Sequence, residues 1–265
     1  MSDMLKKLSR GAAAAAILAF APVGADAASV YFGAQGNLAA SVAFDILPGS
    51  QLQVTLSNTS SFDVLQPADV LTGVFFSGVG NLTSLSALLT ANSTVFYDAD
   101  GQPAGGVVGG EWGFGSGLVG APGGATAALM STGGFVGLGQ PTFPGPDLQS
   151  PTALGGLAYG LLSAGDDTAT GNGGVTGSGG LIKNAVTFTL GGLPAGFSLS
   201  DISSVSFQYG TSLTEPNIPG GTCPNGAVPF PLCNNQVDTP EPVSLTLLGM
   251  GLLGLGAMRA RRSAA

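Results

Sequence analysis

Alternation of apolar and polar side chains predicts β-structure at both ends of the long central region of this chain. Apolar residues occupy every second position over 42–46 and again over 52–56. The sequence Leu47-Pro48-Gly49-Ser50 between these segments is typical of a turn. A period of two places the apolar side chains on one face of each strand, so we expect a β-hairpin there.

The same alternation returns late in the chain, over 186–190, 197–200 and 205–209. Further strands are expected at Val70–Phe76 and Thr94–Tyr97. Strands at both ends with turns between them are typical of all-β domains. The pattern therefore predicts a mostly β fold, an antiparallel β-sandwich of jelly-roll-like type.

Two segments depart from this pattern. Leu82, Leu85, Leu88 and Leu89 have helical spacing, and Asn81 is a suitable N-cap, so we expect a short helix there. Residues 101–180 contain 26 glycines, far above the usual share of about 7%. We expect long glycine-rich surface loops joined by short strands in this part of the domain.

The N-terminus has the three parts of a secretory signal peptide. Its basic, apolar and small-residue segments are, in order, Lys6/Lys7/Arg10, Gly11–Ala21 and Ala25-Asp26-Ala27. We expect export by the Sec translocon and removal of residues 1–27 by signal peptidase before Ala28, the signal itself being helical.

The C-terminus has a second ordered set of segments, in residues 239–265. Pro240-Glu241-Pro242 precedes sixteen uncharged residues, Val243–Met258, which are followed by Arg259, Arg261 and Arg262. As a transmembrane helix this span would measure about 24 Å, short of a hydrocarbon core of about 30 Å. The arginines would stay in the cytoplasm and extend the helix by snorkelling. An ordinary membrane anchor and a hydrophobic tail packed on the body are the alternatives.

These C-terminal residues resemble the PEP-CTERM sorting signal of Gram-negative bacteria. The likeness covers about a tenth of the chain. It implies recognition by the membrane enzyme exosortase, with cleavage near Pro240-Glu241-Pro242. The precursor would be tethered to the inner membrane until it is processed.

Between the two signals lies a body of 211 residues, 28–238, enough for one domain with its own core. Lys183 is its only basic residue against twelve acidic ones, which gives a formal charge of −11. Such a surface repels nucleic acid and anionic lipid. Cys223 and Cys233 close an eleven-residue segment, and in an exported protein we expect a disulfide worth about 2–3 kcal/mol.

The chain contains no histidine and no G-x-S-x-G sequence, which excludes histidine-based nucleophilic catalysis. The body has two glutamates, Glu111 and Glu215, far apart in sequence. We therefore expect a protein that is not an enzyme and needs no cofactor. Asp98/Asp100 and the pair Asp166/Asp167 are weak candidates for binding calcium, and turns or polar loops are the alternative for both.

Several body segments resemble the XDD group of exosortase-dependent surface proteins. They are Tyr159–Asp167, Gly171-Asn172, Leu181–Phe188, Val205–Thr211 and Glu215-Pro216. The likeness implies a bacterial surface protein and supplies no catalytic residue. Asp166 and Asp167 would organise backbone amides or a cation at the start of a loop, and Phe207 and Tyr209 would face the core.

We expect, then, a non-enzymatic protein of the cell surface or the biofilm matrix, an exosortase substrate delivered among exopolysaccharides. The alternative is a carbohydrate-binding module or adhesin that uses Trp112, the only tryptophan, or loop tyrosines to stack on sugars. We expect Trp112 to pack in the core instead. A secreted hydrolase using carboxylates is a third class.

Overall fold

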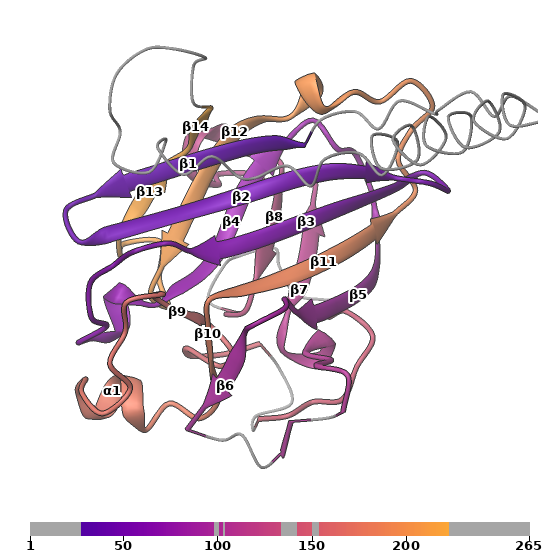
Figure 1. The fold of residues 1–265 in the computed structure, drawn as a ribbon. Helices are drawn as coiled ribbons and strands as arrows, with labels where there is room; N and C mark the ends of the chain where they lie inside the picture. The colour runs from indigo at the N-terminus through magenta and orange to yellow at the C-terminus, as the bar shows by residue number, and fades with distance from the viewer. Residues whose placement is uncertain (1–27, 98–100, 103, 134–141, 150–153, 223–265) are drawn as a thin grey trace, which may run out of the picture.

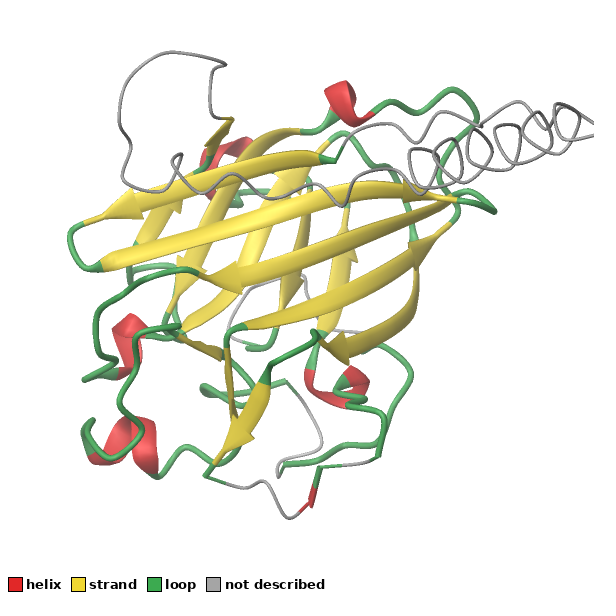
Figure 2. Cartoon of the chain, in the orientation of Figure 1, coloured by secondary structure: helices red, strands yellow, loops and turns green. Residues whose placement is uncertain are grey.

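A computed structural model describes residues 28–97, 101–102, 104–133, 142–149 and 154–222. The expected signal peptide, Cys223 and Cys233, and the C-terminal tail from Thr239 lie outside the described residues. The described part is mostly β, and its strands form two sheets (Figures 1 and 2). The prediction of a mostly β fold with antiparallel sheets is thereby confirmed.

The first sheet has six strands, and every neighbouring pair in it is antiparallel. Their order across the sheet is β14 (Gly221–Thr222), β1 (Ser29–Gln35), β2 (Leu38–Leu47), β3 (Gln51–Asn58), β11 (Ala185–Gly191) and β5 (Thr83–Leu89). The predicted hairpin is β2–β3, with Phe44 opposite Val54. Gly49 and Ser50 adopt positive φ in its turn, which suits the glycine and strains the serine.

The second sheet has eight strands. Its main path is β13 (Asn217–Pro219), β12 (Ser203–Tyr209), β4 (Leu71–Ser77), β9 (Leu161–Leu162), β10 (Leu181–Lys183) and β6 (Thr94–Phe96). On the same side of β4 as β9 lies β8 (Ala127–Met130), which pairs with β7 (Gly113–Ser116). The pair β9–β10 is parallel, and the other pairs are antiparallel. The predicted strands at 70–76, 94–97 and 205–209 correspond to β4, β6 and β12.

The main core lies where the two sheets face each other (Figure 1). Alternate residues of β3 are fully buried, as its period of two requires. Phe44 of the first sheet meets Phe76 of the second with ring centroids 5.2 Å apart and an edge-on geometry. Trp112 packs on Phe188 at 5.0 Å. These contacts join residues that are far apart in sequence, so they fix how the sheets sit on each other.

The predicted helix at 82–89 is wrong, because this segment is the edge strand β5. Its backbone pairs with β11, from Val186 opposite Leu89 to Gly191 opposite Thr83. Leu82 and Leu89 pack against the core, whereas Leu85 and Leu88 are partly exposed. The backbone hydrogen bonds to β11 therefore decide the structure of this segment, although the spacing of its leucines would also suit a helix.

The predicted strand at 197–200 is also wrong. Ser198 caps a short 3₁₀ helix, η5 (Leu199–Asp201), by accepting from the amide of Ser200 at 3.4 Å. Asp201 accepts in return from the amide of Ser198 at 2.9 Å. This reciprocal cap provides hydrogen-bond partners for backbone amides at the start of the 3₁₀ helix. It favours the helix over a strand despite the alternation of apolar and polar residues.

The glycine-rich segment forms loops and short elements, as predicted, yet it contributes to the core. Within its described residues the short helices are η3 (Gly109–Glu111), η4 (Pro122–Gly124) and α1 (Gly173–Thr176), whereas η1 (Pro67–Asp69) precedes β4. Trp112, Leu129 and Tyr159 are fully buried. The prediction that Trp112 packs in the core is confirmed.

The two ends of the described domain lie together, because Tyr31 of β1 pairs with Thr222 of β14 (Figure 1). The first and last described strands therefore lie side by side at one edge of the first sheet. Within the described residues, no helix is both long and apolar enough to cross a bilayer. The expected span Val243–Met258 lies outside this part of the chain.

Glu111 anchors the loop around residues 142–149. One of its carboxylate oxygens, Oε1, accepts from the amides of Leu148 and Gln149 at 2.6 and 2.9 Å. The pKa of Glu111 is raised from 4.5 to about 7, chiefly by burial and also by the neighbouring Asp147, although the two amides act to lower it. Between pH 4.5 and about 7, Glu111 therefore keeps a proton in the folded protein that it releases in the unfolded chain.

This pKa shift predicts that the domain becomes less stable as the pH rises. The stabilisation from Glu111 is complete below pH 4.5 and is lost as the pH passes about 7. We expect Tm to fall by about 3–6 °C between pH 5 and pH 8. Glu111→Gln keeps the accepting oxygen and cannot ionise, so its thermal melts should show a flatter pH profile. An unchanged slope in this variant would contradict the assignment.

Candidate functional site

Two loops join at one corner of the domain where the sheets meet. Residues 59–66 follow β3, and residues 163–172 follow β9. Backbone bonds pair them: Ala164 N donates to Asn58 O at 3.3 Å, Gly165 N to Ser60 O at 3.1 Å, and Asn172 N to Leu65 O at 3.0 Å. We call residues 58–66 and 161–172 together the loop clamp.

Asn58 connects the clamp to both sheets. It is the last residue of β3, it is 2% exposed, and its Nδ2 donates to the carbonyl of Leu161 in β9 at 3.0 Å. Its Oδ1 accepts from the amide of Ser60 at 3.3 Å. A buried amide with both ends hydrogen-bonded fixes the point where the two loops begin.

The close approach of the loops requires glycine at position 165. A Cβ there would overlap the carbonyl oxygen of Ser61. The three nearest atoms all belong to the backbone of Ser61, which cannot move away cheaply. The sequence Ser163-Ala164-Gly165 therefore places the following aspartates directly against the other loop.

Asp63 is held from the opposite loop by two donors. Asp167 N donates to its Oδ1 at 2.9 Å, and the hydroxyl of Thr170 donates to its Oδ2 at 2.6 Å. The Thr170 hydroxyl, followed by the Asp167 amide, lowers the pKa of Asp63. Asp63 is therefore a charged acceptor that fastens the first loop to the second.

Asp166 is buried on the inner side of the same contact, at 5% exposure. Its Oδ1 accepts from the amide of Val64 at 3.0 Å, and its backbone carbonyl accepts from Lys183 Nζ at 2.5 Å. Burial raises the pKa of Asp166, and the nearby Asp63 carboxyl raises it too, whereas Lys183 lowers it. The only basic side chain of the body thus stabilises the clamp.

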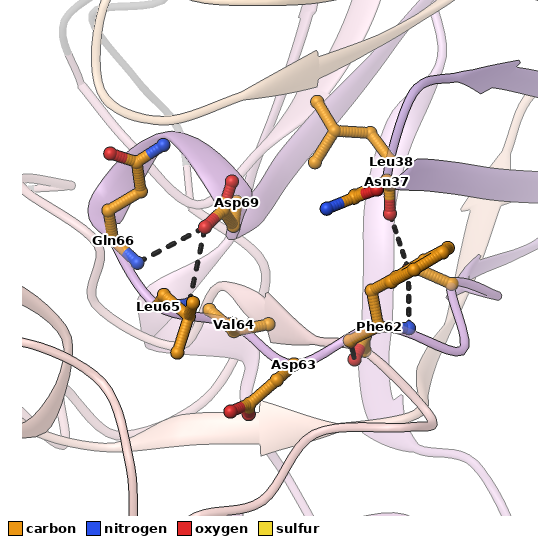
Figure 3. Close-up of a pocket in the computed structure, with 10 residues that line it drawn as sticks. Asn37, Leu38, Phe62, Asp63, Val64, Leu65, Gln66 and Asp69 are labelled. Atoms are coloured by element: carbon orange, nitrogen blue, oxygen red, sulfur yellow. Dashed lines mark hydrogen bonds between the residues drawn. The ribbon is translucent and has the colours of Figure 1, made fainter.

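A pocket of about 310 Å³ opens beside the clamp (Figure 3). Its lining comes from the β1–β2 turn, the loop after β3, η1 and the start of the second loop: Asn37, Leu38, Ser60, Phe62, Asp63, Val64, Leu65, Gln66, Asp69 and Ser163. The hydroxyl of Ser60 donates to Asn37 O at 2.6 Å and accepts from Phe62 N at 3.0 Å. Asp69 Oδ2 accepts from the amides of Leu65 and Gln66, both at 3.2 Å. These bonds fix the pocket wall.

The structure describes one of the two candidate calcium pairs. Asp98 and Asp100 lie outside the described residues, whereas Asp166 and Asp167 belong to the clamp. Asp166 organises the amide of Val64, one of the two roles expected for the pair. Among the described residues, no group of three or more acidic, histidine or cysteine side chains is placed to hold a metal ion.

Sequence reasoning missed Asp63, and no local signal marks it. It lies 104 residues before Asp167, inside a loop of ordinary polar composition. Only the folded arrangement brings these two together. Two other residues singled out in the sequence also have structural contacts: Asn172 caps α1, and Glu215 Oε2 accepts from the amides of Thr211 and Ser212.

The aromatic residues considered for sugar stacking are mostly buried. Trp112, Tyr159 and Tyr209 are fully inaccessible. Phe62, at 50% exposure, is the one exposed aromatic ring within the described part of the chain. A second pocket, of about 420 Å³, is lined without titratable side chains, and Glu111 lines neither pocket.

Comparison with known proteins returned no match to any family model, curated protein or solved structure.

Asp63→Ala should loosen the clamp, because it removes the acceptor for both Asp167 N and the Thr170 hydroxyl. We expect amide hydrogen exchange at 165–172 to become about three- to tenfold faster. Asp201→Ala is the matched control, since it removes an aspartate that caps only η5. Equal exchange at 165–172 in wild type and Asp63→Ala would show that this carboxylate does not fasten the loops.

Proposed function

We propose that this chain is a non-enzymatic exported protein of the cell surface or extracellular matrix, sorted by exosortase through its C-terminal tail. The observation that carries the proposal is the order of segments at the C-terminus. Pro240-Glu241-Pro242, the uncharged span Val243–Met258 and the cluster Arg259, Arg261 and Arg262 follow one another without interruption.

Each segment of the tail has a physical role in this proposal. The arginines stay in the cytoplasm and place the body on the outer side of the inner membrane. The short apolar span holds the precursor there only until it is processed. The two prolines disfavour a helix and present Glu241 in an extended segment, as a protease substrate must be.

The ends of the domain support a two-signal precursor. Strand β1 begins at Ser29, one residue after the expected signal-peptidase cut before Ala28. Strand β14 ends at Thr222, and sixteen residues separate it from Thr239. A chain of that length spans at most about 55 Å when fully extended. The domain can therefore fold in full while the tail remains in the membrane.

We further propose that the two sheets form a jelly-roll-like β-sandwich whose role is structural. The face-to-face sheets and their shared core support this assignment. A formal charge of −11 with a single lysine gives the body an uncharged or acidic surface, suited to a neutral polymer matrix. The partners are the Sec machinery, signal peptidase, exosortase and exopolysaccharide, and we propose no cofactor.

Replacing Arg259, Arg261 and Arg262 with glutamine should impair sorting, because the tail then lacks the cytoplasmic charge that holds it across the membrane. We expect the amount of processed protein at the cell surface to fall severalfold, measured by immunoblotting after proteolysis of intact cells. The matched control replaces all three arginines with lysine, which preserves the charge and should preserve most of the yield. An undiminished surface yield in the glutamine variant would count against the proposal.

A further inference from the structure

We propose that the pocket beside the loop clamp binds a neutral sugar unit of a polysaccharide, with Phe62 as the stacking surface and Asn37 and Asp69 as the hydrogen-bonding groups. The inference rests on the proposed function for its choice of ligand class, because a matrix protein is surrounded by polysaccharide. Its geometric basis is independent of the tail.

Phe62 supplies the apolar surface. Its side chain is half exposed at the pocket wall, and it is the most exposed aromatic side chain among the described residues. The exposed half of this ring is apolar surface that a bound ligand would remove from water, which favours binding. An exposed ring beside polar groups provides the flat face on which the C–H side of a sugar can pack.

Asn37 and Asp69 supply the polar contacts from opposite sides of the pocket (Figure 3). The Asn37 side-chain amide and Asp69 Oδ1 have no hydrogen-bond partner among the described residues, whereas Asp69 Oδ2 is occupied by two amides. An amide offers two donors and an acceptor, and a carboxylate offers acceptors only. This combination matches hydroxyl groups, each of which both donates and accepts.

The pocket is preorganised, which lowers the entropic cost of binding. Ser163 Oγ donates to Phe62 O at 2.5 Å, and the clamp holds the residues on both sides of Phe62. A volume of about 310 Å³ is at the small end of the usual range for ligand pockets, about 300–1,000 Å³. That size suits one sugar unit of a chain that continues into solvent.

The negative charge of the body disfavours the binding of anionic sugars. Asp63 and Asp69 both line the pocket, and the formal charge of the body is −11. Uronic acids and sulfated sugars would meet unfavourable electrostatic potential there. Neutral hexoses and pentoses are therefore the ligand class that the site accepts.

The test is binding of the full chain, purified in detergent, to hexasaccharides of glucose, mannose, galactose and xylose, with a polyuronate hexasaccharide as the anionic comparison. We expect binding to at least one neutral probe and none to the polyuronate. Phe62→Ala and Asn37→Ala should each weaken binding by about tenfold. Leu85→Ala removes an exposed apolar side chain that lines neither pocket, and should leave affinity unchanged.

Thermal melts of each variant separate loss of the site from loss of the fold. Both Phe62 and Asn37 are exposed, so their variants should melt within a few degrees of wild type. No binding to any neutral probe, or binding that survives both substitutions, would overturn the inference. Because the assay uses purified protein, its failure leaves the sorting proposal intact, and a sorting failure leaves this result intact.

Discussion

The apolar faces of the two sheets stabilise each other, and the remaining features of the domain depend on that contact. Phe44 against Phe76 and Phe188 against Trp112 cross the interface from segments far apart in sequence. Because the sheets are fixed in this way, the end of β3 and the start of β9 meet at one corner. Asn58 spans this corner through its bond to Leu161, and the loops that leave it run alongside each other.

The clamp explains why a glycine-rich region still makes an ordered surface. Glycine at 165 allows two backbones to approach closely, and the aspartates that follow it accept or position hydrogen bonds across the gap. Lys183 donates to the backbone carbonyl of Asp166, and its positive charge lowers the pKa of the Asp166 carboxyl. The paired aspartates thus have a structural role, and the surface that they build includes the pocket and Phe62.

Strong alternation let the sequence predict β2, β3, β11 and β12, where alternate apolar side chains face the core. The same reasoning failed at 82–89, since leucines at helical spacing also fit an edge strand whose hydrogen bonds come from β11. At 197–200 a serine cap replaced the expected strand. The role of Asp63 was beyond sequence reasoning, because its partner lies 104 residues away and the contact exists only after the sheets have packed. Phe62 likewise becomes notable only when the other aromatic side chains of the described residues are seen to be buried or half-buried.

The proposed sorting of this protein depends on the order of its C-terminal segments, whereas the clamp and the pocket depend on how the sheets pack. The decisive measurement for sorting is the intact mass of the protein recovered from the cell envelope, in cells with and without exosortase. If the tail is a sorting signal, a species that begins at Ala28 and ends near Pro240 is recovered, and it is absent when the enzyme is missing. A species that retains Arg262 in both strains would contradict it and make the tail a plain anchor.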